Sequence, residues 1–161
     1  MERWRRGASI GCAGAMMVCV AAIFAPFLCQ AGSLALAKWR WAQSGGSSYT
    51  LVVSQFCNCY ITGEYRLTVL NGAVRAATLE NSAQMKGALP PDAFEHLTVE
   101  AVFAQAEREV RRNWWPDWNR RFVVEYDPAL GYVTHLETGD RRAPQFYFVY
   151  NARDVESVEA P

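Results

Sequence analysis

The sequence has no surplus of charge of either sign. Its 161 residues hold 16 Lys and Arg against 16 Asp and Glu, so the formal charge at pH 7 is zero. A protein that mainly neutralises nucleic-acid phosphates needs a basic surplus, and that class is therefore excluded. Histidine is scarce, since His96 and His135 are the two present, and neither has metal-ligand spacing. No Gly-rich loop followed by Lys is present to cradle a phosphate. We expect no nucleic-acid partner, no metal and no cofactor.

Charge is also missing from a long N-terminal stretch. After Arg3, Arg5 and Arg6 no charged residue occurs until Lys38, and residues 12–29 carry no polar side chain. A basic start, an apolar run and small residues around Ala31 are the layout of a secretory signal. The sequence therefore predicts that residues 1–31 are a signal peptide or an N-terminal membrane anchor and that residues 32–161 are exported.

The length of the apolar run leaves cleavage and retention open. A signal h-region has about 7 to 15 residues and a spanning helix about 17 to 25, and this run lies between the two. The small residues favour cleavage, and the length favours retention. In either case the basic end stays in the cytoplasm. We expect a periplasmic protein, or one on the outer face of the cytoplasmic membrane, where residues 8–29 serve as the anchor if the segment is retained.

The exported part begins with a short helix and three strands. Ser33 can cap a helix over about 33–43, which the Gly-rich stretch 44–48 stops. Residues 49–57 alternate with the period of a strand. Two further alternating runs flank Asn71-Gly72, the signature of a type I′ hairpin. That turn predicts that Val69 pairs with Val74 and Leu67 with Ala76.

The second half repeats this order. Residues 81–97 are loop-like, and Thr98 can cap a helix over about 98–112. Two strands then flank a turn from Asp127 to Gly131, and a last strand covers 145–151. The sequence thus predicts a single α+β domain in the order αβββ-αβββ, with two helices on a mostly antiparallel sheet of about six strands.

A family resemblance is carried by residues spread over most of this domain: Trp39, Tyr49-Thr50-Leu51, Cys57-Asn58-Cys59, 67–74, Val102-Phe103 and 126–132. Their order and spacing resemble the bacterial family called domain of unknown function 6174, over about residues 36–155. The resemblance implies a small exported protein, and many members are membrane-tethered. Because the family has no assigned activity, it implies no catalytic residue.

Cys57 and Cys59 are the cysteines that stay with the exported part after cleavage. In an oxidising compartment an even pair favours a disulfide. Residues i and i+2 of a strand point the same way at a Cα separation near the upper limit for a bridge, so a local bend is needed. We expect a structural disulfide. Free thiols and a metal or redox function are the alternatives, although no CxxC at a helix N-terminus is present to lower a thiol pKa.

An Arg- and Trp-rich segment over residues 111–121 is the strongest functional signal. Indole faces beside guanidinium groups suit a sugar ring, a lipid headgroup or an anionic partner. The alternative is that the indoles close one end of the core while the arginines are solvated. The candidate ligand-binding residues are Arg111, Arg112, Trp114, Trp115, Trp118, Arg120 and Arg121.

Two functions of different class follow. The first is a non-enzymatic envelope domain that binds a partner protein, a lipid surface or a cell-wall polymer through residues 111–121. The second is a small extracytoplasmic hydrolase or thiol-active enzyme built on Cys57 and Cys59. Ser54 and Ser82 lack a nucleophile-elbow setting, so we expect no serine-based catalysis.

Overall fold

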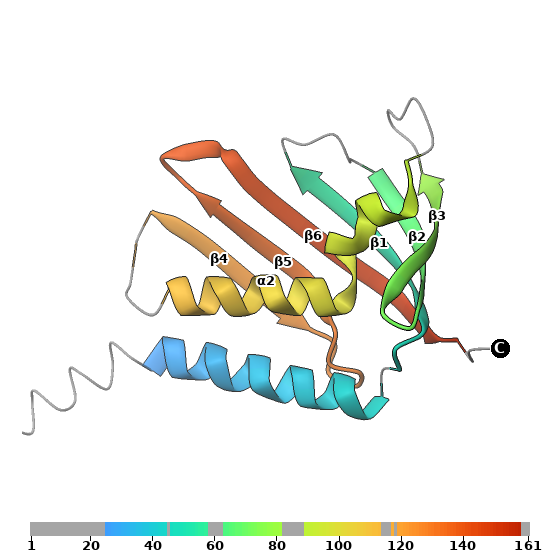
Figure 1. Cartoon of the computed structure of the whole chain (residues 1–161). Coiled ribbons are helices and arrows are strands. Elements are labelled where there is room, and N and C mark those ends of the chain that lie inside the picture. The colour runs from blue at the N-terminus through green and yellow to red at the C-terminus, as the bar shows by residue number, and fades with distance from the viewer. Residues whose placement is uncertain are drawn as a thin grey trace, which may run out of the picture.

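The alternating apolar residues of the two halves form one antiparallel sheet of six strands, covered on one face by helices (Figure 1). A computed structural model describes residues 25–44, 46–57, 63–81, 89–113, 117 and 119–158. The strands are β1 Tyr49–Cys57, β2 Gly63–Leu70, β3 Ala73–Asn81, β4 Arg120–Tyr126, β5 Val133–Asp140 and β6 Ala143–Ser157. The helices are an N-terminal helix over 25–44, the 3-10 helix η1 Pro91–Leu97 and the α-helix α2 Val99–Arg112. The predicted α+β class is confirmed.

The sheet joins two three-stranded meanders at their centre. Its order is β3-β2-β1-β6-β5-β4, so the first and last strands of the chain are neighbours. Tyr49 of β1 pairs with Ser157 of β6 at one end, and Cys57 pairs with Phe148 near the other. Strands β3 and β4 are left as the two edges of the sheet.

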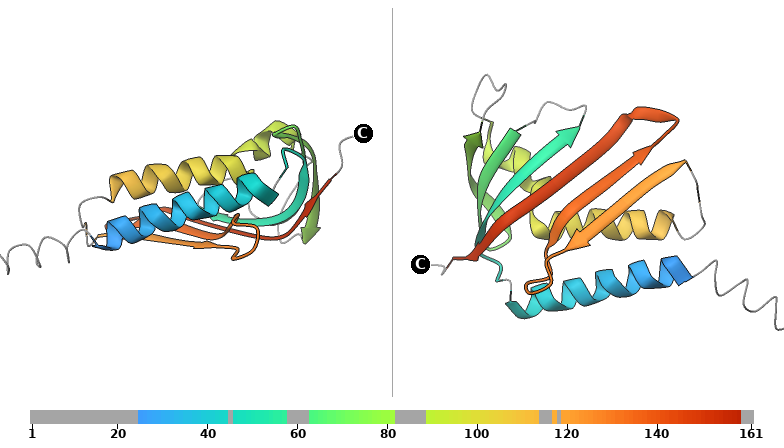
Figure 2. Two further views of the ribbon diagram at one scale, coloured as in Figure 1. Left: turned by 90° about the horizontal axis from the view of Figure 1, so that it is seen from below. Right: turned by 180° about the vertical axis from the view of Figure 1, so that it is seen from behind.

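The N-terminal helix and α2 lie side by side on one face, and no described helix covers the other face (Figure 2). On the covered face the strands contribute fully buried residues such as Leu51, Leu67, Leu136 and Tyr150. Helix α2 places one apolar stripe against them, made of Val99, Val102, Phe103, Ala106 and Val110. The core therefore lies between the sheet and two helices. Polar side chains that could form a site lie at the rims of the sheet and on its uncovered face.

The first helix is longer than predicted. Its buried residues Leu34, Ala37 and Trp41 are preceded at helical spacing by Phe27 and Ala31, which pack on the same core. Ser33, predicted as the cap, donates its hydroxyl to the Gln30 carbonyl 2.9 Å away, which is an interior-helix contact. The predicted start at residue 33 is therefore wrong. Of the described residues, no helix is long and apolar enough to span a membrane.

The Asn71-Gly72 hairpin is confirmed, with one change of register. Asn71 has φ 53° and Gly72 φ 77°, as a type I′ turn requires, and Val69 pairs with Val74. A bulge then shifts the pairing, so Leu67 lies opposite Ala77 and the predicted pair with Ala76 is wrong. The extra residue between Val74 and Ala76 is exposed Arg75, and the shift lets Ala77 pack against the core.

The connections also differ in part from prediction. Residues 91–97, predicted as loop, form η1. Pro91 suits the first turn of a helix, and the helix buries Phe94 and Leu97, which are three residues apart. The last strand runs over Ala143–Ser157, well beyond the predicted 145–151. Thr98 caps α2 as predicted, accepting from the Ala101 amide at 3.3 Å.

Candidate functional site

An open pocket of about 340 Å³ lies where α2 ends and β4 begins. We call it the arginine pocket, and its lining comes from α2, β4, β5 and β6: Glu109, Arg112, Arg120, Arg121, Thr138, Gly139, Asp140 and Ala143. Three of the predicted ligand-binding residues, all arginines, are therefore brought together. They come from both ends of the Arg- and Trp-rich segment.

A turn at Asp117 closes this segment. The Asp117 carboxylate accepts from the Asn119 amide at 3.0 Å, and the Asp117 carbonyl accepts from the Arg120 amide at 3.0 Å. Asp and Asn favour such turns because their short side chains hydrogen-bond to nearby backbone groups. The turn directs the chain into β4, so Arg120 comes back beside the end of α2.

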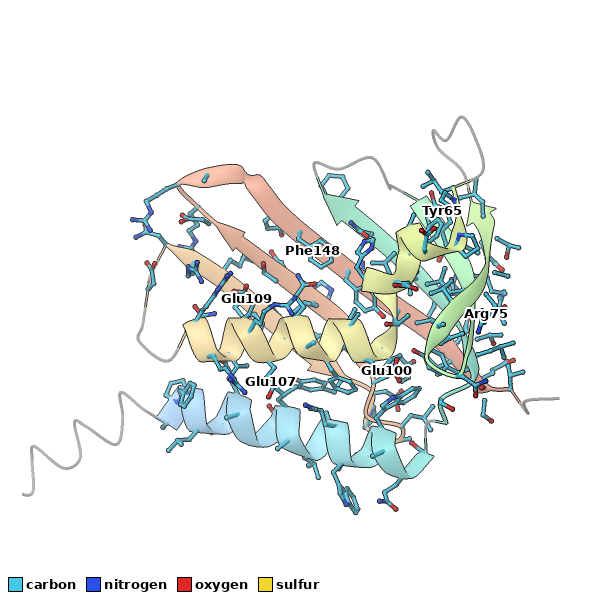
Figure 3. The ribbon with its side chains drawn as sticks, in the orientation of Figure 1. Tyr65, Arg75, Glu100, Glu107, Glu109 and Phe148 are labelled. Atoms are coloured by element: carbon cyan, nitrogen blue, oxygen red, sulfur yellow. The ribbon has the colours of Figure 1, made fainter. Side chains whose placement is uncertain are left out.

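Glu109 holds the two arginines that flank the segment. One of its carboxylate oxygens lies 3.2 Å from Arg112 Nη1, and the other lies 3.7 Å from Arg120 Nη1. Its side chain is 14% exposed. Figure 3 shows Glu109 on the side of α2 that faces the sheet, whereas Glu107 lies toward the N-terminal helix. One carboxylate thus fixes two guanidinium groups at the pocket wall.

The β5–β6 turn supplies the opposite wall. Asp140 accepts from the Arg142 amide at 2.8 Å and from Arg142 Nε at 3.3 Å, and these donors hold the pKa of Asp140 below its usual value. Arg142 Nη2 also lies 3.5 Å from the Asp117 carboxylate. The Arg141 amide donates to the Asn119 carbonyl at 2.8 Å. Backbone and side-chain bonds therefore tie the two turns together.

Arg121 connects the pocket to the uncovered face of the sheet. Its guanidinium is ion-paired with Glu137, a carboxylate that is 5% exposed even though no described helix covers it. Tyr147 donates its hydroxyl to the same carboxylate and lies over Gly139, where a Cβ would stand 2.8 Å from the ring. Burial of Glu137 raises the carboxyl pKa, but the hydrogen bonds from Tyr147 and Arg121 outweigh it, and the pKa is lowered overall.

A polar row continues from Glu137 across the uncovered face. His135 Nε2 is 3.8 Å from the Glu137 carboxylate, and His135 Nδ1 is 2.7 Å from the Asn151 side-chain oxygen. The Asn151 amide group donates to Ser54 Oγ at 3.4 Å. The row spans β5, β6 and β1, and each member holds the next in place.

The lining of the arginine pocket carries charges of both signs, with three arginines against two carboxylates. Three guanidinium groups supply fixed donors, and the carboxylates of Glu109 and Asp140 supply fixed acceptors. A hydroxyl group both donates and accepts, so it can use both kinds of group, whereas an anion is attracted by the arginines but repelled by the two carboxylates. The ring of Tyr147 lies over Gly139 on the uncovered face, beside Glu137, and is not part of the lining. Donors and acceptors in one place suit a polyhydroxylated ligand.

The other predicted site residues are placed differently. Arg111 does not line the pocket, because it points to solvent, 77% exposed, and pairs with Glu107 at 3.3 Å. Trp114, Trp115 and Trp118 lie outside the described residues, as do Cys59 and the side chain of Cys57. The predicted disulfide and indole contacts therefore stay predictions. In the part of the chain that the structure describes, no three His, Cys, Asp or Glu side chains could hold a metal ion.

Sequence reasoning missed Glu109, Thr138, Asp140 and Glu137. A faint signal existed for Glu109, since it stands three residues before Arg112 on one helix face, where opposite charges meet. Thr138 and Asp140 come from β5, which pairs with β4 across the predicted turn, but no local signal shows that the end of this hairpin meets the end of α2. Glu137 resembled an ordinary solvent-facing charge in an alternating strand.

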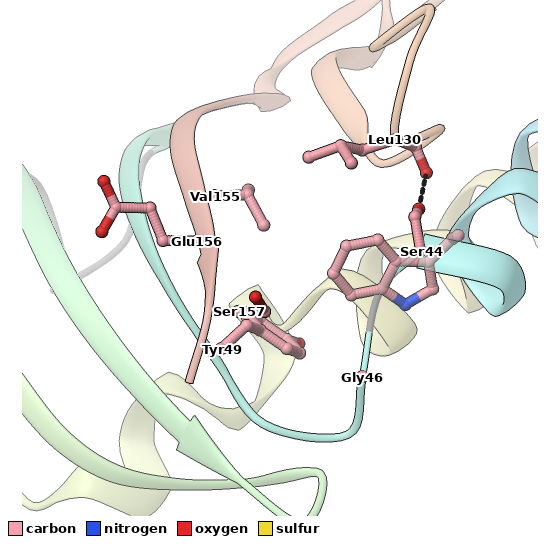
Figure 4. A pocket seen from close by; sticks show the side chains of 8 residues that line it. Ser44, Gly46, Tyr49, Leu130, Val155, Glu156 and Ser157 are labelled. Atoms are coloured by element: carbon pink, nitrogen blue, oxygen red, sulfur yellow. Dashed lines mark hydrogen bonds between the residues drawn. The ribbon is translucent and has the colours of Figure 1, made fainter. Parts of the chain in front are cut away.

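A second pocket, of about 330 Å³, lies where the N-terminal helix meets the β4–β5 turn (Figure 4). Trp41 and Tyr49 form one wall, with ring centroids 5.1 Å apart and nearly perpendicular. Their polar atoms are occupied by Glu100, at 3.1 Å from Trp41 Nε1 and 2.6 Å from the Tyr49 hydroxyl. Figure 4 shows Glu156 directed away from the pocket. This wall therefore offers mainly ring surface and few polar contacts.

Comparison with known proteins identifies a family but no specific function. The model described as "Family of unknown function (DUF6174)" matches residues 33–156, which include the arginine pocket and the polar row. No curated protein and no solved structure matches the chain.

Proposed function

Because the chain belongs to the family of unknown function DUF6174, we propose its role from its own geometry. It is an exported, non-enzymatic binding domain of the cell envelope that holds a cell-wall glycan in the arginine pocket. The single observation that carries this proposal is the pocket lining, in which three arginines and two carboxylates stand together. Of the three partner classes predicted from the sequence, a glycan suits a pocket that offers both donors and acceptors better than an anionic lipid surface does.

The ion pairs at the pocket support a binding role. Glu109 pairs with Arg112 and Arg120, and Glu137 pairs with Arg121, so the three arginines are partly oriented before any ligand arrives. A ligand then loses less of its binding free energy to the ordering of long side chains. The predicted contribution of Trp114, Trp115 and Trp118 adds stacking surface in the same segment.

Export is supported by the N-terminal sequence. Arg3, Arg5 and Arg6 precede an uncharged apolar run over 12–29, the order of a secretory signal. We place the domain in the periplasm or on the outer face of the cytoplasmic membrane, where a cell-wall polymer is within reach.

The positions of the histidines support a non-enzymatic role. A serine nucleophile needs a histidine within hydrogen-bond reach to take its proton. Asn151 stands between His135 and Ser54 and occupies the ring nitrogen that would face the serine. His96 faces the Gln55 side chain at 2.9 Å.

The proposal is tested by co-sedimentation of the full chain with insoluble cell-wall glycan. Arg112→Ala combined with Arg120→Ala should weaken binding at least about tenfold, since a hydrogen bond from a charged group contributes roughly 1.5 to 3 kcal/mol. Arg111→Ala is the matched control, because Arg111 is adjacent in sequence but lies outside the pocket. Its binding should stay within about twofold of the unaltered chain.

Circular dichroism of each variant separates lost binding from lost folding. Equal loss in the pocket variant and in Arg111→Ala would contradict the assignment to the pocket. Binding to anionic lipid vesicles with none to glycan would contradict the ligand class.

A further inference from the structure

Strand β4 is an edge whose outer side has no described neighbour. It pairs with β5 alone, and Figures 1 and 2 show it at one margin of the sheet. Alternate residues of an edge strand direct their amide and carbonyl groups away from the sheet, where they can pair with another chain. The other edge, β3, is interrupted by the bulge at Arg75 and packs against η1. The outer side of β4 is therefore the more available edge.

The apolar residues of β4 are incompletely covered. Phe122, Val123 and Val124 are all half-buried, whereas Leu51 and Val53 of the central strand β1 are completely buried. Seven consecutive residues of β4 contain no Pro or Gly to protect the edge. A further strand laid against this edge would cover the apolar surface that is now partly exposed.

The charges of β4 are arranged symmetrically about Val123. Arg121 stands two residues before it and Glu125 two residues after, so both side chains share the uncovered face with Val123. Glu125 is exposed and has no ion-pair or hydrogen-bond partner among the described residues. Arg121 contacts Glu137 through Nε, and its guanidinium carries further N–H donors.

We propose that β4 pairs with β4 of a second copy of this chain, antiparallel about a two-fold axis at Val123. In this register Val123 meets its own copy, and Arg121 meets Glu125 of the partner twice over. On the covered face, Phe122 meets Val124 of the partner. A shift of the register by two residues would set Val123 opposite Arg121 or Glu125, so that the opposite charges no longer face each other.

The paired sheets form one sheet of twice the strand number with a continuous uncovered face. Each copy brings its own arginine pocket to the assembly. If these pockets bind a glycan polymer, as proposed above, the dimer holds one polymer at two points and gains avidity without any new contact. The strand pairing itself does not depend on that function.

The test is site-specific oxidative cross-linking of the full chain carrying Val123→Cys. Directly opposite residues in an antiparallel pair lie about 4.5 to 5.5 Å apart between Cα atoms, a separation that a disulfide bridges. Val149→Cys is the matched control, since Val149 is a half-buried valine on the uncovered face of the central strand β6. A non-reducing gel should show covalent dimer forming at least about tenfold faster for Val123→Cys, with the unaltered chain as the background of native cysteines.

A charge reversal at Glu125 completes the test. Glu125→Lys in the Val123→Cys chain turns two attractions into two repulsions and should slow cross-linking about tenfold. Equal rates for Val123→Cys and Val149→Cys would overturn the pairing. An unchanged rate of cross-linking at Val123 in the Glu125→Lys chain would overturn it as well, because Glu125 would then not face Arg121 of the partner. Neither result would contradict the glycan proposal, because co-sedimentation with glycan does not require a dimer.

Discussion

Glu137 is the residue that links the arginine pocket to the uncovered face. Its carboxylate is almost fully buried and receives Arg121 and Tyr147, while His135 stands 3.8 Å away. Leaving such a buried group without partners would cost about 1 to 3 kcal/mol of stability, and the contacts from Arg121 and Tyr147 avoid that cost. These contacts therefore stabilise the sheet and also form a border of the site.

This environment predicts a pH dependence of stability. The folded state lowers the Glu137 pKa, so the carboxylate stabilises the fold above its unfolded pKa of roughly 4.3 and loses that effect as pH falls through the lower folded value. Glu137→Gln should cost about 1 to 2 kcal/mol at pH 7 and show a flatter loss of stability between about pH 5 and pH 3. Urea unfolding at several pH values measures both. Curves of the same slope for both chains would show that Glu137 does not titrate in this way.

The sequence predicts the cationic side of the site better than the anionic side. Arg112, Arg120 and Arg121 stand in one segment and could be proposed together from the sequence. Glu109 and Asp140 could not, because each is one of many acidic residues and its role depends on how the β4–β5 hairpin packs against the end of α2. Side chains that meet only through tertiary pairing leave no local pattern.

At the scale of elements, local chemistry predicts the turns well. Asp127 accepts from the Leu130 amide at 2.7 Å, and Gly131 takes φ 86° as its place in the turn requires. Errors occur where tertiary packing decides. The N-terminal helix extends back because Phe27 and Ala31 pack on the core, and η1 forms because Phe94 is buried there.

The β4–β5 turn also fixes the N-terminal helix, and one glycine makes the contact possible. A Cβ on Gly131 would clash with the Ala37 carbonyl and lie 2.7 Å from Arg40 Cβ. Gly131→Ala should therefore lower the free energy of unfolding by at least about 2 kcal/mol, through overpacking added to the cost of a positive φ. Thermal or urea unfolding measures the loss.

Gly72→Ala is the matched control for this prediction. Gly72 also has a positive φ, 77°, but a Cβ there meets nothing within 4 Å. Gly72→Ala should lower the free energy of unfolding only by the cost of a positive φ, about 1 kcal/mol. Equal losses at the two positions would mean that the turn does not press on the helix.

At the scale of the whole molecule, the order αβββ-αβββ follows from the sequence pattern, but the strand order does not. The pairing of β1 with β6 joins segments almost a hundred residues apart, as in Val53 with Ala152. No local signal marks it, and the same elements could form two separate meanders. Because β1 and β6 pair at the centre, β3 and β4 become the two edges of the sheet. The arginine pocket therefore lies at the β4 edge.

We propose that a glycan binds in the arginine pocket. Backbone amide chemical shifts of the isotope-labelled full chain, titrated with soluble cell-wall glycan fragments, test it most directly. We predict that the largest shifts fall on the pocket residues Arg112, Arg120, Thr138 and Gly139. Shifts centred instead on Trp41 and Leu130 of the second pocket, or no saturable shifts at all, would show that the arginine pocket does not bind glycan.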